Sequence, residues 1–217
     1  MEYRTVFHKK LQEIQDDVTR MGGLVGDAIQ SSVDALTGQD LDLANRIVEG
    51  DKRINQLRFD IEEKCVQLIA TQQPIASDLR NLVAVLNIIT EMERIGDYAV
   101  GIGKITVMIG HEPPLKPLVD IPRMAVQTVD MLRRSLDAFI AGDADSAQRI
   151  TLEDDIVDDL YEKVFKELLG IMMKDGETVT RATRLIWVAH DLERSADRVT
   201  NICERVVFVV TGKMEEI

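Results

Sequence analysis

The sequence EMERIGD at residues 91–97 is similar to DLERSAD at residues 191–197, at an offset of 100 positions. A second match precedes it, because residues 35–57 align with residues 138–160 at an offset of 103. Both matches occur in the same order, which indicates that the chain holds two copies of one unit. The change in offset indicates that the second copy lost three residues near the turn between the two matching segments.

The spacing of apolar residues within a unit predicts helices. Along the first segment, apolar or small residues recur at alternating steps of four and three: Phe7, Leu11, Ile14, Val18, Met21, Val25, Ala28, Ser32 and Ala35. This spacing is typical of helices that pack with a left-handed twist. Helix-breaking residues follow near Thr37-Gly38 and Gln73-Pro74, and again near Ala141-Gly142 and Asp175-Gly176. Each unit should therefore hold three helices of roughly 25–35 residues, antiparallel to their neighbours because the connections are short.

The two units meet at residues 112–117, where the sequence EPPLKP cannot continue a helix. We therefore expect an all-α protein of two tandem antiparallel three-helix bundles, with six long helices in total. The first bundle should span residues 1–112 and the second bundle residues 113–217.

Composition excludes several classes of protein. The formal net charge is −12 and no block of Lys or Arg occurs, which argues against nucleic acid and anionic membrane surfaces as partners. Two cysteines cannot form a disulfide framework, and no run of eighteen uncharged apolar residues predicts a membrane span. The mixed charges of the N-terminal segment do not resemble a signal peptide. These features together predict a cytoplasmic protein.

Acidic residues interrupt the apolar seams of the second and third helix of each unit. They are Asp51 and Glu93 in the first unit, and Asp154 and Glu193 in the second. Each has a polar partner four residues later, on the same helix face: Asn55, Asp97, Asp158 and Asp197. Antiparallel helices should place Asp51 level with residue 96 and Asp154 level with residue 196. We therefore expect one buried cluster of four such side chains in each bundle.

Converging carboxylates in a seam repel one another and need compensation. A metal ion is one answer, since hard cations and iron bind carboxylate oxygens. Nearby basic side chains are another, and the candidates are Lys52, Arg53, Arg94, Arg194 and Arg198. A third answer is a seam that is wide enough to stay wet. The residues alone leave all three open.

The repeated motifs resemble those of the PhoU family. The stretches 93–97 and 193–197 resemble its E/D-x-x-x-D signature, residues 49–55 and 153–158 resemble the partner motif on the preceding helix, and residues 73–80 resemble the turn between them. One E-x-x-x-D motif is a weak indication, but the doubled set in order is specific. The similarity extends over nearly the whole chain.

The resemblance implies a function that spacing alone does not show. PhoU-like proteins are non-enzymatic regulators that restrain the phosphate ABC transporter and silence the phosphate-starvation response. The implied partners are the transporter ATPase PstB and the sensor kinase PhoR, with membrane contact only through them and with room for a homodimer. The resemblance also implies that the two acidic clusters hold metal ions, with multinuclear iron ahead of zinc, manganese or magnesium.

One position departs from the doubled pattern. Asn55 stands where the second unit has Asp158, and an amide ligates through its oxygen but brings no charge. The first site should therefore bind metal more weakly or hold a smaller cluster.

Two other functions compete with the regulatory one. A catalytic di-iron protein of ferritin-like type needs Glu-x-x-His on helices of a four-helix bundle. None of the three histidines, His8, His111 and His190, lies three residues after a Glu. A metal-free helical scaffold with ion-paired acids is the remaining alternative.

Overall fold

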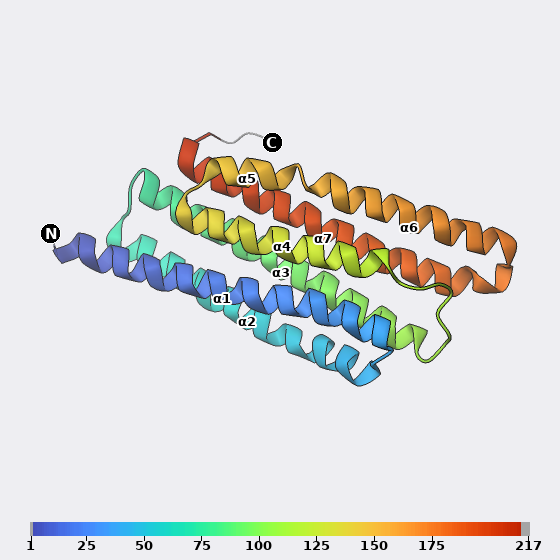
Figure 1. Cartoon of the computed structure of the whole chain (residues 1–217). Coiled ribbons are helices and arrows are strands. Elements are labelled where there is room, and N and C mark those ends of the chain that lie inside the picture. Colours follow the sequence, from blue (N-terminus) through green and yellow to red (C-terminus); the bar gives the residue numbers. More distant parts are fainter. Residues whose placement is uncertain (1, 214–217) are drawn as a thin grey trace.

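The computed structural model describes the backbone of residues 2–213 and the side chains of residues 6–213. Its elements, in chain order, are α1 (Glu2–Gly38), α2 (Leu41–Gln72), α3 (Ser77–Ile109), α4 (Asp120–Ala141), α5 (Ala144–Thr151), α6 (Asp154–Lys174), a 3-10 turn (Gly176–Thr178) and α7 (Val179–Thr211). Figure 1 shows an elongated molecule in which α1, α2 and α3 lie beside α4, α5, α6 and α7. The all-α fold with two three-helix units is confirmed, and each predicted helix break is present.

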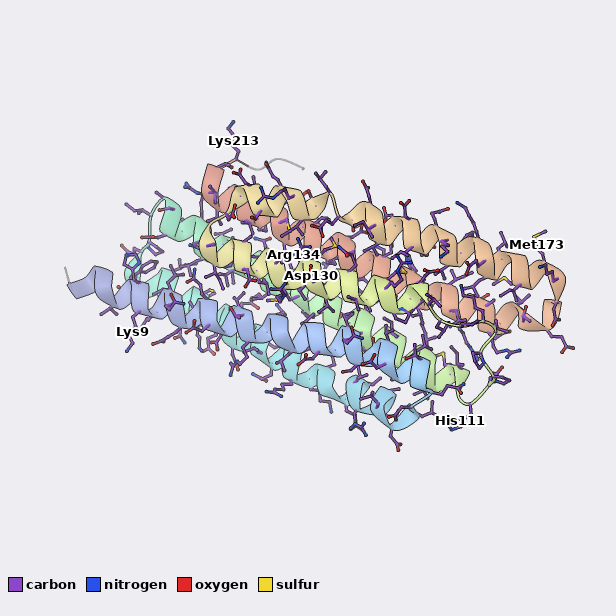
Figure 2. The ribbon with its side chains drawn as sticks, viewed as in Figure 1. Lys9, His111, Asp130, Arg134, Met173 and Lys213 are labelled. Carbon is purple, nitrogen blue, oxygen red and sulfur yellow. The ribbon has the colours of Figure 1, made fainter. Side chains whose placement is uncertain are left out.

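The second helix of the second unit is interrupted, which the sequence did not lead us to expect. It is divided into α5 and α6, with a turn at Leu152 and Glu153 between them. The Glu153 side chain accepts hydrogen bonds from Gln127 at 2.9 Å and from Arg134 at 2.8 Å, and both donors belong to α4. Figure 2 shows Arg134 beside Asp130 on α4, and the Arg134 Nε donates to Asp130 at 2.7 Å. The acidic run at residues 153–155 also favours a helix start, because helix N-termini attract negative charge.

The first turn of each unit uses the same capping device. Asp40 accepts a hydrogen bond from the Leu43 N–H at 2.8 Å, and Asp143 accepts one from the Ser146 N–H at 2.9 Å. The residue before each cap is left-handed, with φ of 52° at Gln39 and 65° at Gly142. Glycine adopts this conformation without steric cost. The turn of the second unit, which has glycine at this position, is therefore the less strained of the two.

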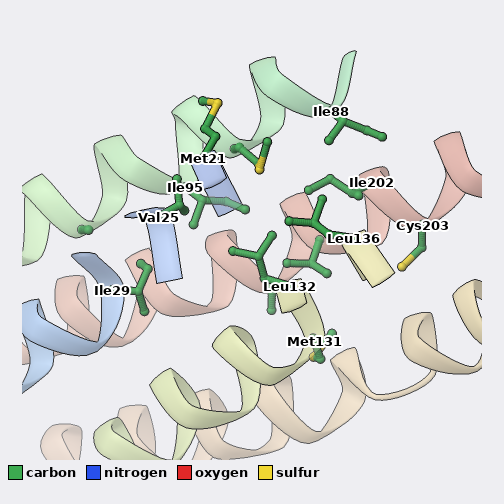
Figure 3. Packing of buried hydrophobic residues seen from close by; sticks show 14 of the residues in the cluster. Met21, Val25, Ile29, Ile88, Ile95, Met131, Leu132, Leu136, Ile202 and Cys203 are labelled. Carbon is green, nitrogen blue, oxygen red and sulfur yellow. The ribbon is translucent and has the colours of Figure 1, made fainter. Parts of the chain in front are cut away.

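The two units pack against each other through antiparallel helix pairs. Between α3 and α7, Asn201 donates to Glu91 at 3.3 Å and the Arg184 guanidinium donates to the Met108 carbonyl at 2.8 Å. One cluster of buried apolar side chains runs through both units. Figure 3 shows its centre, where Leu132 and Leu136 of α4 lie among side chains of α1, α3 and α7. The division at residue 112 into separate bundles stays a prediction, because the core is shared.

An ion pair between the buried carboxylate of Asp120 and the half-exposed Lys163 holds the start of α4 to α6. The Asp120 carboxylate lies 2.8 Å from Lys163 Nζ and 3.0 Å from the Arg123 guanidinium. The hydrogen bond from Lys163 lowers the pKa of Asp120, so the charged pair persists at neutral pH.

Within residues 2–213, the helices lack the long apolar run that crossing a membrane would require.

Substitutions at two glycines would measure the effects of backbone strain and of helix propensity on stability separately. Gly142 has a φ of 65° and Gly170 lies inside α6, and a Cβ added at either would meet nothing within 4 Å. Gly142→Ala should lower the free energy of unfolding by about 1 kcal/mol, because alanine disfavours positive φ. Gly170→Ala should raise it by up to about 1 kcal/mol through helix propensity. Urea unfolding of both variants would measure the two changes in free energy. A loss of stability in both variants would contradict the prediction that only Gly142 is required by its backbone conformation.

Candidate metal centre

The first acidic site lies where α2 and α3 approach closely. A Cβ at Gly96 of α3 would lie 3.3 Å from the Ile54 side chain and 3.9 Å from Asp51 Oδ1 of α2. Glycine permits this approach, and Asp51 therefore lies level with residue 96, as the antiparallel arrangement predicts. Asn55 follows Asp51 on α2, and its Nδ2 donates to Asp51 Oδ2 at 2.7 Å.

Several polar groups of the first site lack partners. Asp51 Oδ1 and Asn55 Oδ1 are buried atoms without a hydrogen bond. Burial, followed by the charge of Asp97, raises the pKa of Glu93, whereas the Arg58 guanidinium lowers it. Burial and the charge of Asp51 likewise raise the pKa of Asp97. The three carboxylates of this site therefore interact electrostatically, and Asn55 is hydrogen-bonded to Asp51. Arg58 is a fifth member whose role the sequence pattern did not reveal.

The second acidic site joins α6 and α7. Asp154 is the first residue of α6, where the helix dipole favours a carboxylate. Burial, and then the charges of Asp158, Asp197 and Glu193, nevertheless raise the pKa of Asp154 to about 7. Burial and Asp197 raise the pKa of Glu193. Asp154 Oδ1 and Glu193 Oε2 are buried without a hydrogen-bond partner. The structure thus places all four predicted residues of this site on the facing helices α6 and α7, where their charges affect one another.

Basic side chains compensate these acids only in part. Arg194 pairs with Asp197 at 2.6 Å, and His190 Nδ1 lies 3.3 Å from Glu193 Oε2 without the geometry of a hydrogen bond. Arg198, a predicted counterion, instead pairs with Glu91 at 3.4 Å across the α3–α7 interface. Ion pairing therefore occurs at the second site, where it leaves Asp154 Oδ1 and Glu193 Oε2 without a hydrogen-bond partner.

The acids are more accessible than their seam positions predicted. Asp97 and Asp158 are exposed, and the other six site residues are half-buried: Asp51, Asn55, Glu93, Asp154, Glu193 and Asp197. The reason is that the partner four residues along a seam lies at its edge, where a carboxylate can reach water. The expected burial of the two clusters is therefore only partial, and the exposure agrees with a seam that is wide enough to stay wet.

The side chains do not form a closed cage. Among the described residues, no three His, Cys, Asp or Glu side chains lie close enough together to hold an ion. Mutual repulsion explains this, because Asp197 turns to Arg194 and Glu193 lies against His190. The orphaned buried oxygens of Asp51, Asn55, Asp154 and Glu193 still fit a hard cation, which would require the carboxylates to turn toward one another.

The two sites differ beyond the replacement of Asp158 by Asn55. Arg58 in the first unit corresponds to Tyr161 in the second, and Thr90 corresponds to His190. The first site thus has three carboxylates near an arginine, whereas the second has four carboxylates near a tyrosine and an imidazole. The second site has the greater negative charge to neutralise.

Comparison with known proteins identifies the family. The sequence profile of the PhoU domain matches residues 18–106 and 121–206. The chain belongs to the PhoU family. It is 37% identical to the phosphate-specific transport system accessory protein PhoU homolog of Clostridium acetobutylicum, over 99% of this chain and 98% of that protein. It is 38% identical to the PhoU accessory protein of Escherichia coli K12, over 95% of this chain and 86% of that protein.

Solved structures agree with this assignment. The crystal structure of the phosphate transport system regulatory protein PhoU from Streptococcus pneumoniae superimposes with a TM-score of 0.90 at 31% identity, over 97% of this chain and 100% of that chain. PhoU from Pseudomonas aeruginosa gives a TM-score of 0.90 at 34% identity, over 95% of this chain and 100% of that chain. Each of the two PhoU-domain matches contains one acidic site, residues 51–97 or residues 154–197.

The electrostatics of Asp154 predict an unusual pH dependence for metal-free protein. Its folded pKa of about 7 lies above that of an unfolded Asp, so the folded state binds more protons and stability falls as pH rises from about 4 to 7. Asp154→Asn should therefore be more stable than the wild type at pH 8, with the difference vanishing toward pH 4. Thermal unfolding in chelator across this range would measure it. Destabilisation of the variant at pH 8 would contradict the raised pKa of Asp154 as the cause of the pH dependence.

Proposed function

We propose that this protein is a non-enzymatic regulator of phosphate uptake that acts from the cytoplasm on the phosphate ABC transporter. The observation that carries the proposal is the identity of 37% and 38% to named accessory proteins of the phosphate-specific transport system, over nearly the full chain. The names describe an accessory and a regulatory protein rather than an enzyme. The partners we propose are the transporter ATPase PstB and the sensor kinase PhoR.

Metal binding at the two acidic sites is the second part of the proposal. The donor set is carboxylate and amide oxygen, which suits iron, manganese and magnesium better than soft-ligand metals. Unpaired buried oxygens on both members of the α6–α7 pair, and on α2 of the first site, support this interpretation. A bound cation would neutralise the repulsion between α6 and α7 and so stabilise their contact. We propose iron, in a multinuclear cluster, at the second site before the first.

Gene deletion tests the regulatory role. Cells that lack this gene should express phosphate-scavenging genes even in high phosphate, because the transporter and sensor lose their restraint. Reporter expression from such a gene is the measurement, with the wild-type gene restored on a plasmid as the control. Normal repression in the deletion strain would reject the regulatory role and leave the scaffold alternative.

A double substitution tests the metal ligands. The variant Asp154→Ala with Glu193→Ala should fold and should lose the metal of the second site, measured by elemental analysis of protein purified without chelator. The matched control is Asp159→Ala with Glu162→Ala, which removes two exposed acids of α6 outside the site. Unchanged metal content in the first variant, or equal loss in the control, would overturn the ligand assignment.

A further inference from the structure

An exposed apolar strip runs along the second bundle beyond its acidic site. On α6, Phe165, Leu169 and Met173 recur every four residues and are 36%, 43% and 81% exposed. Figure 2 shows Met173 at the end of α6, pointing away from the bundle. Residues spaced by four share one helix face, so these side chains form a continuous line.

Aromatic side chains connect this line to α7 and to the acidic site. The Tyr161 ring lies 6.3 Å from the Phe165 ring and 6.2 Å from the His190 ring of α7. Trp187 lies one turn before His190 and is 53% exposed. We call the set the aromatic strip: Tyr161, Phe165, Leu169, Met173, Trp187 and His190.

The first bundle lacks the aromatic part of this strip, although Val66, at the place of Leu169, is likewise exposed, at 54%. Arg58 and Glu62 occupy the places of Tyr161 and Phe165, and they form an ion pair at 3.0 Å. Asn87 and Thr90 occupy the places of Trp187 and His190. The fold is therefore compatible with polar side chains at these positions, so stability of the bundle does not explain the aromatic ones.

The charge beside the strip also differs between the units. Residues 154–174 of α6 contain six acids and three bases, a charge of −3, and the acids are concentrated in residues 154–162. The corresponding residues 51–71 contain four acids and four bases and carry no net charge. An apolar surface beside a block of negative charge is complementary to a helix with an apolar face and basic flanks.

We propose that the surface of α6 and α7 binds a basic amphipathic helix of a partner protein, with the aromatic strip as the apolar contact and the exposed acids Asp155, Asp159 and Glu162 as the electrostatic contact. An anionic membrane or the same acidic surface of a second copy would be repelled by these charges. The strip and these three acids are not among the proposed metal ligands, so this docking site does not depend on metal binding or on the role in phosphate uptake.

The single tryptophan provides a direct reporter, because Trp187 lies within the strip. The probe is a synthetic helical peptide of about five turns, with Leu along one face and Lys on both flanks. It should bind saturably, shift the Trp187 emission to shorter wavelength and bind more weakly as salt is raised. A peptide with Glu in place of Lys, and one with scrambled Leu positions, should not bind.

A double substitution that copies the first bundle tests the strip. Tyr161→Arg with Phe165→Glu introduces the ion pair that the first bundle already carries, so folding should be retained. Peptide affinity should fall by about tenfold or more, since buried aromatic anchors dominate such contacts. The matched control, Arg58→Ala with Glu62→Ala, changes the corresponding pair of the first bundle and should leave affinity unchanged.

Several outcomes would overturn the proposal. Absence of peptide binding, or equal affinity of the Tyr161→Arg, Phe165→Glu variant, would reject the strip as the contact. Equal binding of the Glu-flanked peptide would reject the role of the acids. A Trp187 emission shift with protein concentration alone would assign the surface to a second copy, and a shift only with phosphatidylglycerol vesicles would assign it to a membrane.

Discussion

The antiparallel contact between α3 and α7 is the constraint on which the rest of the structure depends. The pairs Glu91 with Asn201, Gly101 with Asp191, and Met108 with Arg184 keep one register along both helices. That register places position 96 level with position 196, at the centre of the two acidic motifs. The two sites are consequently held at mid-length on either side of a shared helix pair, with α2 and α6 supplying the opposing residues.

Divergence of the two copies explains why one scaffold carries two different surfaces. The first copy has Arg58 and Asn55 where the second has Tyr161 and Asp158, and both differences reduce the negative charge of the first site. The second copy has four carboxylates with aromatic residues beside them, and its middle helix is interrupted so that Asp154 begins α6. Burial and mutual repulsion raise the pKa of Asp154 to about 7. The charged carboxylates of this site therefore destabilise the metal-free protein, and a bound cation would reduce their repulsion.

Much of the fold and of the two acidic sites could be predicted from the sequence, because helical periodicity and an internal repeat can be read directly from the spacing of residues. Spacing alone predicted the helix breaks and the alignment of Asp51 with residue 96. It also predicted that the eight site residues lie on facing helices in two groups of four, although their side chains do not converge on one point. The helix break at Glu153 did not, since it depends on Gln127 and Arg134 of α4, although the acidic run at residues 153–155 was a local indication. The exposure of Asp97 and Asp158, and the roles of Arg58 and His190, required side-chain positions.

The duplicated acidic motifs are, in our proposal, cation sites of which the second is the stronger. Anomalous diffraction at the iron absorption edge, from crystals of protein purified without chelator, tests this most directly. We predict a peak between α6 and α7, bounded by Asp154, Asp158, Glu193 and Asp197. No anomalous peak there, with these carboxylates bound only to Arg194, His190 and water, would contradict the proposal.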